Sequence, residues 1–126
     1  MTHRLVRNAY AQRRGLYNMK NNIIANAFSL QMLTLTKPMQ VTVEPVTNDE
    51  VKTAIAGGFT SAVGHADTAA VLSNMLGTEV ACNRVSVKLD ADTVLYVAQV
   101  IGGRLPEGST TLPDGITIQW VRVTVR

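Results

Sequence analysis

The sequence predicts a single small α/β domain with a mixed central sheet of about five strands and two main helices. A chain of 126 residues is long enough for one hydrophobic core and too short for two domains of ordinary size. Its apolar residues alternate in some segments with the period of two of a strand, and in others with the (i, i+3, i+4) spacing of a helix. We therefore expect strands and helices to pack in layers, rather than a pure bundle or sandwich.

The first part of the domain should contain two strands and a short helix. Residues 22–28 form an apolar run suited to a buried strand, and residues 39–46 alternate as a second strand. Residues 47–50 (TNDE) form a capping box, in which a threonine and a glutamate side chain each bond the other's backbone amide. This motif predicts a helix over about 48–56, and Gly57-Gly58 should end it because glycine enters the left-handed C-terminal conformation without a steric cost.

The second helix should start at His65 or Ala66, bury a stripe of apolar residues, and stop at Gly77. The apolar period then changes to two. Residues 85–89 and 93–101 are separated by a short acidic turn, which predicts a β-hairpin.

A long irregular segment precedes the last strand. Residues 102–115 (GGRLPEGSTTLPDG) are rich in glycine and proline, whereas residues 116–126 alternate and should close the sheet. Ordered domains seldom keep a loop of this length without a use, so we interpret it as a lid or binding loop. A tolerated insertion is the alternative.

The composition argues against several classes of protein. No apolar run approaches the ~18 residues of a membrane helix, and no secretory signal is recognised, so we expect no membrane association and a cytoplasmic location. Cys82 is the only cysteine, which excludes an intrachain disulfide and fits a reducing compartment. With His3 and His65 as the only histidines, the sequence contains no zinc-ligand spacing, and we expect neither a metal nor a cofactor.

The positive charge is concentrated at the N-terminus. Residues 1–20 hold five basic residues and no acid, whereas residues 21–126 hold seven bases and nine acids, a balance of −2. We therefore divide the chain into a basic N-terminal extension, 1–20, and a folded domain, 21–126. The extension could contact phosphates through counterion release or could be a solvated tail. Because the domain itself is mildly acidic, we expect no DNA partner.

Five polar residues are candidates for chemistry, and each has an ordinary alternative. Asn26 in the first strand either satisfies a buried backbone group or reaches a ligand at the end of the sheet. His65 either caps the second helix or acts on a ligand there. Arg104 offers a planar guanidinium that could bind a phosphate, and Glu107 offers a carboxylate that could bind a ribose hydroxyl. The alternative is that the two side chains form a solvent-exposed ion pair that contributes little. Arg84, which follows an asparagine, is a further candidate.

The stretch before the second helix favours an anion. In GFTSAVGH, small residues including Ser61 and Gly64 surround His65 and leave the first helical amides open. A phosphate could lie on these donors and on the positive helix end, within reach of the imidazole. We therefore include Ser61 and Gly64 among the ligand-binding candidates.

Four stretches, taken in order, resemble one known family. IIANAFSLQML, GFTSAVGHADTAAVLSNMLG, NRVSVKL and RLPEG are similar as a set to the viral anti-CRISPR ring nucleases of type III systems, over about residues 22–126. The resemblance implies a homodimeric α/β protein that binds cyclic tetra-adenylate. Cyclic tetra-adenylate is the second messenger that activates the defence nucleases of type III CRISPR systems. The resemblance implies that the protein cleaves it without a metal to linear di-adenylate with 2′,3′-cyclic phosphate ends, and that this cleavage silences the defence. The basic extension has no counterpart in the family.

The resemblance also implies roles for individual residues. The family's histidine falls on His65, which would be the general acid. Its loop arginine and glutamate fall on Arg104 and Glu107, the latter activating or orienting the attacking 2′-hydroxyl. Its strand asparagine and the arginine after asparagine fall on Asn26 and Arg84, which would hold ribose and phosphate. A two-fold dimer suits a ring of four equivalent nucleotides, because an isologous interface presents the same site twice.

Two other classes of function remain open at this point. The same pocket could sequester a cyclic nucleotide without cutting it, or the basic extension could make the protein a nucleic-acid-binding regulator. Ring size, turnover rate and a viral or host origin are left open by the sequence, and a viral protein would act in the cytoplasm of its host.

Overall fold

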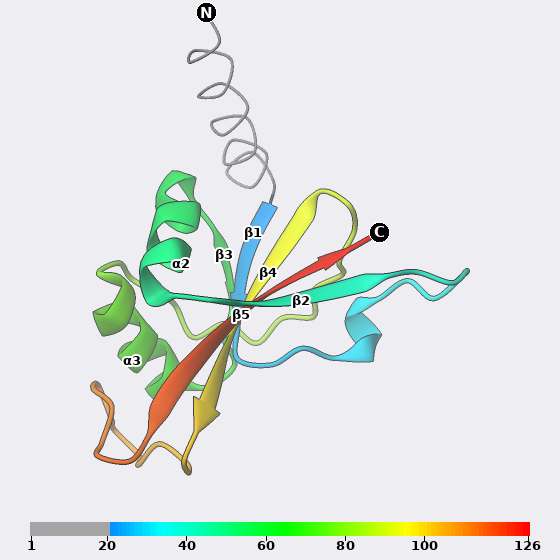
Figure 1. The fold of residues 1–126 in the computed structure, drawn as a ribbon. Helices are drawn as coiled ribbons and strands as arrows, with labels where there is room; N and C mark the ends of the chain where they lie inside the picture. Colours follow the sequence, from blue (N-terminus) through cyan, green and yellow to red (C-terminus); the bar gives the residue numbers. More distant parts are fainter. Residues whose placement is uncertain (1–20) are drawn as a thin grey trace, which may run out of the picture.

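Residues 21–126 fold around one mixed five-stranded sheet, in the order β2-β5-β4-β1-β3 (Figure 1). The structure is a computed structural model, and it describes these residues; the proposed N-terminal extension, 1–20, lies outside them. The parallel pairs are β1 with β3 and β1 with β4, and β5 is antiparallel to both β4 and β2. The strands are β1 Asn21–Ala25, β2 Val41–Val46, β3 Thr60–Ala62, β4 Thr93–Ile101 and β5 Thr117–Val125.

Two α-helices have the ends that the sequence predicts. The capping box forms at Thr47, and helix α2 runs over Asn48–Ala54 before one 3-10 turn, η2, Ile55–Gly57. Helix α3 runs over Ala66–Leu76 and ends at Gly77, whose φ of 68° is left-handed. A further 3-10 turn, η1, covers Leu30–Met32.

The sheet is covered differently on its two faces. Helices α2 and α3 pack on one face and bury the larger core, which includes Ile24, Leu72 and Tyr96. The other face carries a second core around Leu95 and is covered by the irregular segments 28–39 and 87–89. Figure 1 shows both helices on one side of the sheet and the segment with η1 on the other. The predicted α/β fold, with five strands and two main helices, is confirmed.

The predicted hairpin of residues 85–89 with 93–101 is wrong. Residues 85–89 form no strand, because both edges of β4 are already occupied by β1 and β5. The alternation reflects packing instead: Val87 and Leu89 contact the second core, and the Leu89 amide bonds the Met32 carbonyl at 2.8 Å. The fifth strand is β3, which the sequence analysis did not predict, and the β-hairpin is formed by β4 and β5.

One ion pair crosses the helix-covered face of the sheet. Arg122 of β5 bonds Glu44 of β2 at 3.0 Å and lies opposite Tyr96 of β4, whose side chain is fully buried. Burial opposes the charge on Arg122, but the hydrogen bonds and charges of Glu44 and Tyr96 outweigh it and raise the pKa of the guanidinium. Arg122 therefore stays charged and ties three strands together.

No helix within residues 21–126 is long and apolar enough to span a bilayer.

Candidate functional site

The candidate residues gather where β1 and β3 end. These two strands are parallel neighbours, so that the segments after them leave the sheet at the same edge. Asn26 follows β1 directly, while Gly64 and His65 connect β3 to helix α3. Asn26 thus lies just beyond the strand and not within it as predicted, because β1 ends at Ala25.

The peptide groups of Gly64 are held by two of the predicted site residues. The Gly64 amide donates to Oδ1 of Asn26 at 3.0 Å, and its carbonyl accepts from Nε of Arg84 at 2.8 Å. A side chain at position 64 would meet the Arg84 side chain, since a Cβ there would lie 3.3 Å from its Cγ. Glycine at this position therefore allows the arginine to lie across the loop.

Both contacts leave polar groups for a ligand. The bond from Arg84 uses Nε and leaves the two terminal amino groups of an exposed guanidinium, while Asn26 retains its amide donors. Arginine binds phosphate best through two parallel N–H groups. The arrangement thus offers charge and directed donors at one point of the surface.

Asn83 fixes the segment that carries Arg84. Its side chain donates to the Ser61 carbonyl and its backbone amide to the Val63 carbonyl, both at 2.7 Å. These bonds extend the isolated bridge between Val63 and Cys82 along the free edge of β3. In the sequence Asn83 stands out only as the neighbour of Arg84, because its positioning role depends on β3, a strand without a sequence signal.

His65 occupies the N-cap of helix α3 without capping it. Its backbone is extended, with φ −128°, and its side chain makes no cap hydrogen bond. The residue is exposed. The imidazole therefore stands at a helix N-terminus whose first amides are not satisfied by the cap side chain, which is a favourable place for an anion.

The predicted binding loop lies against the same helix. The Gly108 amide donates to Oδ1 of Asp67 at 2.8 Å, and Nδ2 of Asn74 donates to the Thr110 carbonyl. Glu107, the residue before Gly108, is thereby tied to the first turn of α3, which begins directly after His65. The only local signal of these contacts in the sequence is an acid two residues after the histidine, which does not predict them.

Arg104 lies in the same loop, closer to its start. It is exposed, and within residues 21–126 its guanidinium forms no hydrogen bond or ion pair.

The base of the loop is narrow, since a Cβ on Gly102 would lie 2.1 Å from the Gly115 carbonyl oxygen. Two glycines with positive φ, 102° and 83°, thus allow the ends of the loop to meet.

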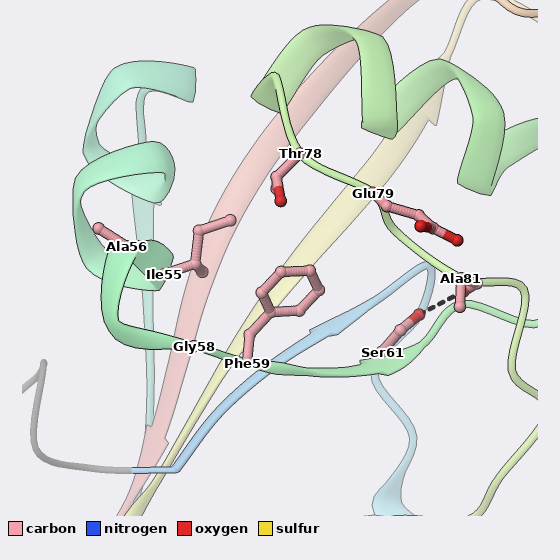
Figure 2. Close-up of a pocket in the computed structure, with 8 residues that line it drawn as sticks. All are labelled: Ile55, Ala56, Gly58, Phe59, Ser61, Thr78, Glu79 and Ala81. Carbon is pink, nitrogen blue, oxygen red and sulfur yellow. Dashed lines mark hydrogen bonds between the residues drawn. The ribbon is translucent and has the colours of Figure 1, made fainter.

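Ser61 lies apart from the group around Gly64. Its hydroxyl donates to the Ala81 carbonyl at 2.6 Å and helps to line a pocket of about 380 Å³ at the outer edge of β3 (Figure 2). The ring of Phe59 and the carboxylate of Glu79 also line this pocket. Its volume is near the lower limit for a drug-sized ligand, so a ring of four nucleotides would not fit within it.

The chemistry available around Gly64 is acid–base chemistry and phosphate binding. A guanidinium and a carboxamide meet at Gly64, an exposed histidine follows it in the chain, and a carboxylate lies on the attached loop. Among the residues that the structure describes, no three His, Cys, Asp or Glu side chains are grouped so that they could hold a metal ion. These groups suit the transfer of protons around a phosphodiester.

Comparisons with known proteins agree on the fold. The family model described as STIV B116-like matches residues 22–117. Among solved structures, the chain is similar to B116 of Sulfolobus turreted icosahedral virus (STIV), with 24% identity, a TM-score of 0.68, and coverage of 82% of this chain and 98% of that chain. A comparison with curated proteins gave no match.

Proposed function

Because the chain belongs to the STIV B116-like family, we propose that it is a metal-independent ring nuclease that cleaves cyclic tetra-adenylate, the second messenger of type III CRISPR systems. The products would be linear di-adenylates with 2′,3′-cyclic phosphate ends, and loss of the messenger would suppress the defence. The observation that carries the proposal is the convergence of Asn26, His65 and Arg84, far apart in sequence, on the loop at Gly64.

The reaction needs alignment, charge stabilisation and two proton transfers. A ribose 2′-oxygen attacks its own 3′-phosphorus, and the bond from phosphorus to the 5′-oxygen of the next nucleotide breaks. Glu107 accepts the proton of the 2′-hydroxyl, and His65 donates a proton to the departing 5′-oxygen. The Arg84 guanidinium and the first amides of α3 stabilise the charge on the phosphoryl oxygens.

The loop of residues 102–115 acts as a lid in this proposal. Its contacts with α3 hold Glu107 on the helix that carries the general acid, and the exposed Arg104 remains available for a ligand phosphate. Closure over the ring would exclude water from the reacting bond.

A homodimer would provide two such sites for one ring. Large apolar side chains are exposed in and next to the segments that cover the second core: Leu30 at 67% and Val85, two residues before Val87, at 48%. Val85 is also the neighbour of Arg84 in the sequence. A two-fold contact through this surface would bury it and bring two guanidinium groups toward a ligand of the same symmetry.

A cleavage assay with a chelator tests the function. Purified protein in excess EDTA is incubated with cyclic adenylates of several sizes, and the products are separated by thin-layer chromatography. We expect linear di-adenylate with a cyclic phosphate end. His65→Ala should retain ring binding and turn over about 10²- to 10⁴-fold more slowly, the range typical of a general acid. His3→Ala, which removes the other histidine, should cleave at the wild-type rate.

Two results would contradict the proposal in different ways. Recovery of the intact ring after denaturation of the complex would favour a protein that sequesters the messenger. Unchanged turnover by His65→Ala would remove this residue from the reaction and leave the activity to be explained by other groups.

A further inference from the structure

We propose that Asp67 is a positioning residue of the reaction, which holds Glu107 in place by binding the loop that carries it. The inference rests on the proposed function. Asp67 does not contact the ring in this proposal. Its carboxylate accepts a hydrogen bond from the Gly108 amide at 2.8 Å, across 41 positions of sequence.

The bonded amide belongs to a tight turn with Glu107 at its corner. The Ser109 amide donates to the Pro106 carbonyl at 3.1 Å, and the Ser109 hydroxyl donates to the same oxygen at 2.6 Å. Gly108 has a φ of 81°, and no residue other than glycine has a positive φ within 21–126, so residues 106–109 form a type II turn. In this turn the Gly108 amide points away from the turn's own hydrogen bond and is available to Asp67.

The bond therefore fixes the peptide group between Glu107 and Gly108. The turn restricts the backbone on both sides of Glu107, and the Asp67 carboxylate anchors the whole turn to the first turn of α3. His65 lies two residues before Asp67 at the start of the same helix. The proposed general base and general acid are thus linked through one hydrogen bond and one turn of helix.

An acid at this helix position could also act only on the helix dipole, and the matched residue Asp49 of α2 provides a control for such a first-turn charge. Carboxylates in the first turn complement the helix dipole whatever else they bond. Asp49 is likewise the second residue of its helix, α2, and makes no bond to the loop. Asp49→Ala therefore measures the effect of losing a first-turn charge on a helix that does not follow His65, whereas Asp67→Ala removes both the charge at the start of α3 and the anchor. Asp67→Asn removes the charge but keeps an oxygen that can accept from Gly108.

The second contact of the loop provides a positional control. Asn74 bonds the Thr110 carbonyl two turns further along α3, on the far side of the turn from Glu107. Asn74→Ala should loosen the end of the loop without freeing the Glu107 peptide group. If any attachment of the loop to α3 were sufficient to position Glu107, Asp67→Ala and Asn74→Ala would lower kcat equally.

The test combines amide exchange with single-turnover and steady-state cleavage of cyclic tetra-adenylate by the full chain. In Asp67→Ala, we expect protection of the Gly108 amide to fall about threefold to tenfold, the effect of losing one hydrogen bond. We expect kcat to fall about tenfold and KM to stay within twofold, because the groups around Gly64 that hold phosphate are unchanged. Asp67→Asn should recover most of kcat, and Asp49→Ala should match the wild type.

The outcomes separate the two proposals. If the wild type cleaves the ring while Asp67→Ala keeps the wild-type kcat or Gly108 protection, Asp67 has no positioning role and the proposed function stands. Equal losses of kcat in Asp67→Ala and Asp67→Asn would assign the effect to the charge at the start of α3 and overturn the inference. If the wild type does not cleave the ring, the proposed function fails and the positioning role with it, whatever the exchange of Gly108.

Discussion

The narrow base of the 102–115 loop can be tested with three glycine-to-alanine variants that differ in one factor at a time. Gly57 has no positive φ and open space around it, Gly108 has a φ of 81° and open space, and Gly102 has a φ of 102° and a crowded site. In Gly57→Ala, the gain from a less flexible unfolded chain should leave stability unchanged or raise it by up to about 1 kcal/mol. Gly108→Ala should lose about 1 kcal/mol to left-handed strain.

Gly102→Ala should lose considerably more than either. Its Cβ would lie 2.1 Å from the Gly115 carbonyl oxygen and 3.2 Å from the carbonyl carbon, and both atoms belong to the backbone. The base of the loop would have to open by about 1 Å, which adds about 1–3 kcal/mol of the kind seen on overpacking to the conformational strain. We expect a total of about 2–4 kcal/mol, or a fall in Tm of about 6–20 °C for a domain of this size.

Thermal and urea unfolding of the three variants measures these differences directly. The order of stability should be Gly57→Ala, then Gly108→Ala, then Gly102→Ala. A Gly102→Ala protein that melts together with Gly108→Ala would show that the two ends of the loop do not meet as the structure has them. The reasoning about a closed loop base would then be refuted.

Three further predictions concern the rest of the domain. Thr47→Ala should lower the free energy of unfolding in urea by about 1 kcal/mol, because it removes the N-cap of α2. Arg122→Met should cost about 1–3 kcal/mol, because it leaves the buried Tyr96 without its guanidinium neighbour, and adding Tyr96→Phe should recover part of this loss in a double-mutant cycle. Since the pKa of Arg122 is raised, the stability that this charge contributes is present at all pH values below about 12, so the loss in Arg122→Met should be the same at pH 6 and pH 9. In the slowly cleaving His65→Ala variant, adding Asn26→Ala should weaken ring binding about tenfold in calorimetry, because the Gly64 peptide is no longer held by Asn26; unchanged affinity would place Asn26 outside the ring site.

Helix ends were the most predictable part of the fold, because their signals are local. The capping box at 47–50 and the glycine at 77 each act within one turn of chain, and the structure has α2 and α3 where these residues place them. Strand β3 has only three residues, Thr60–Ala62, and exists because β1 offers it a parallel edge. No periodicity can develop over so short a segment. The alternation in 85–89 is real, but alternation reports which side chains are buried and not whether the backbone has a strand partner.

The residue types of the candidate site are visible in the sequence, whereas the contacts between them are not. Asn26, His65 and Arg84 stand out in the sequence as polar side chains in an apolar strand, at a helix start and after an asparagine, although each also has an ordinary use. That Asn26 and Arg84 hold the two sides of Gly64 depends on the strand order, which brings together residues 38 and 20 positions apart. The contact between Asp67 and Gly108 likewise depends on the path of a long loop, for which the sequence contains no periodic signal.

The position of β1 in the sheet has a consequence for synthesis of the chain. This strand precedes the other four in the sequence, yet both of its neighbours, β3 and β4, are made later, and β4 begins 72 positions after β1 starts. A nascent chain leaving the ribosome can pair β1 with β3 once about half of the protein has been made, but the other edge of β1 must stay unpaired until β4 follows, at about three quarters of the chain. Asn26 depends on that strand for its place, so the groups around Gly64 should be assembled late in translation, and a chain stalled before β4 should be inactive and prone to capture by chaperones.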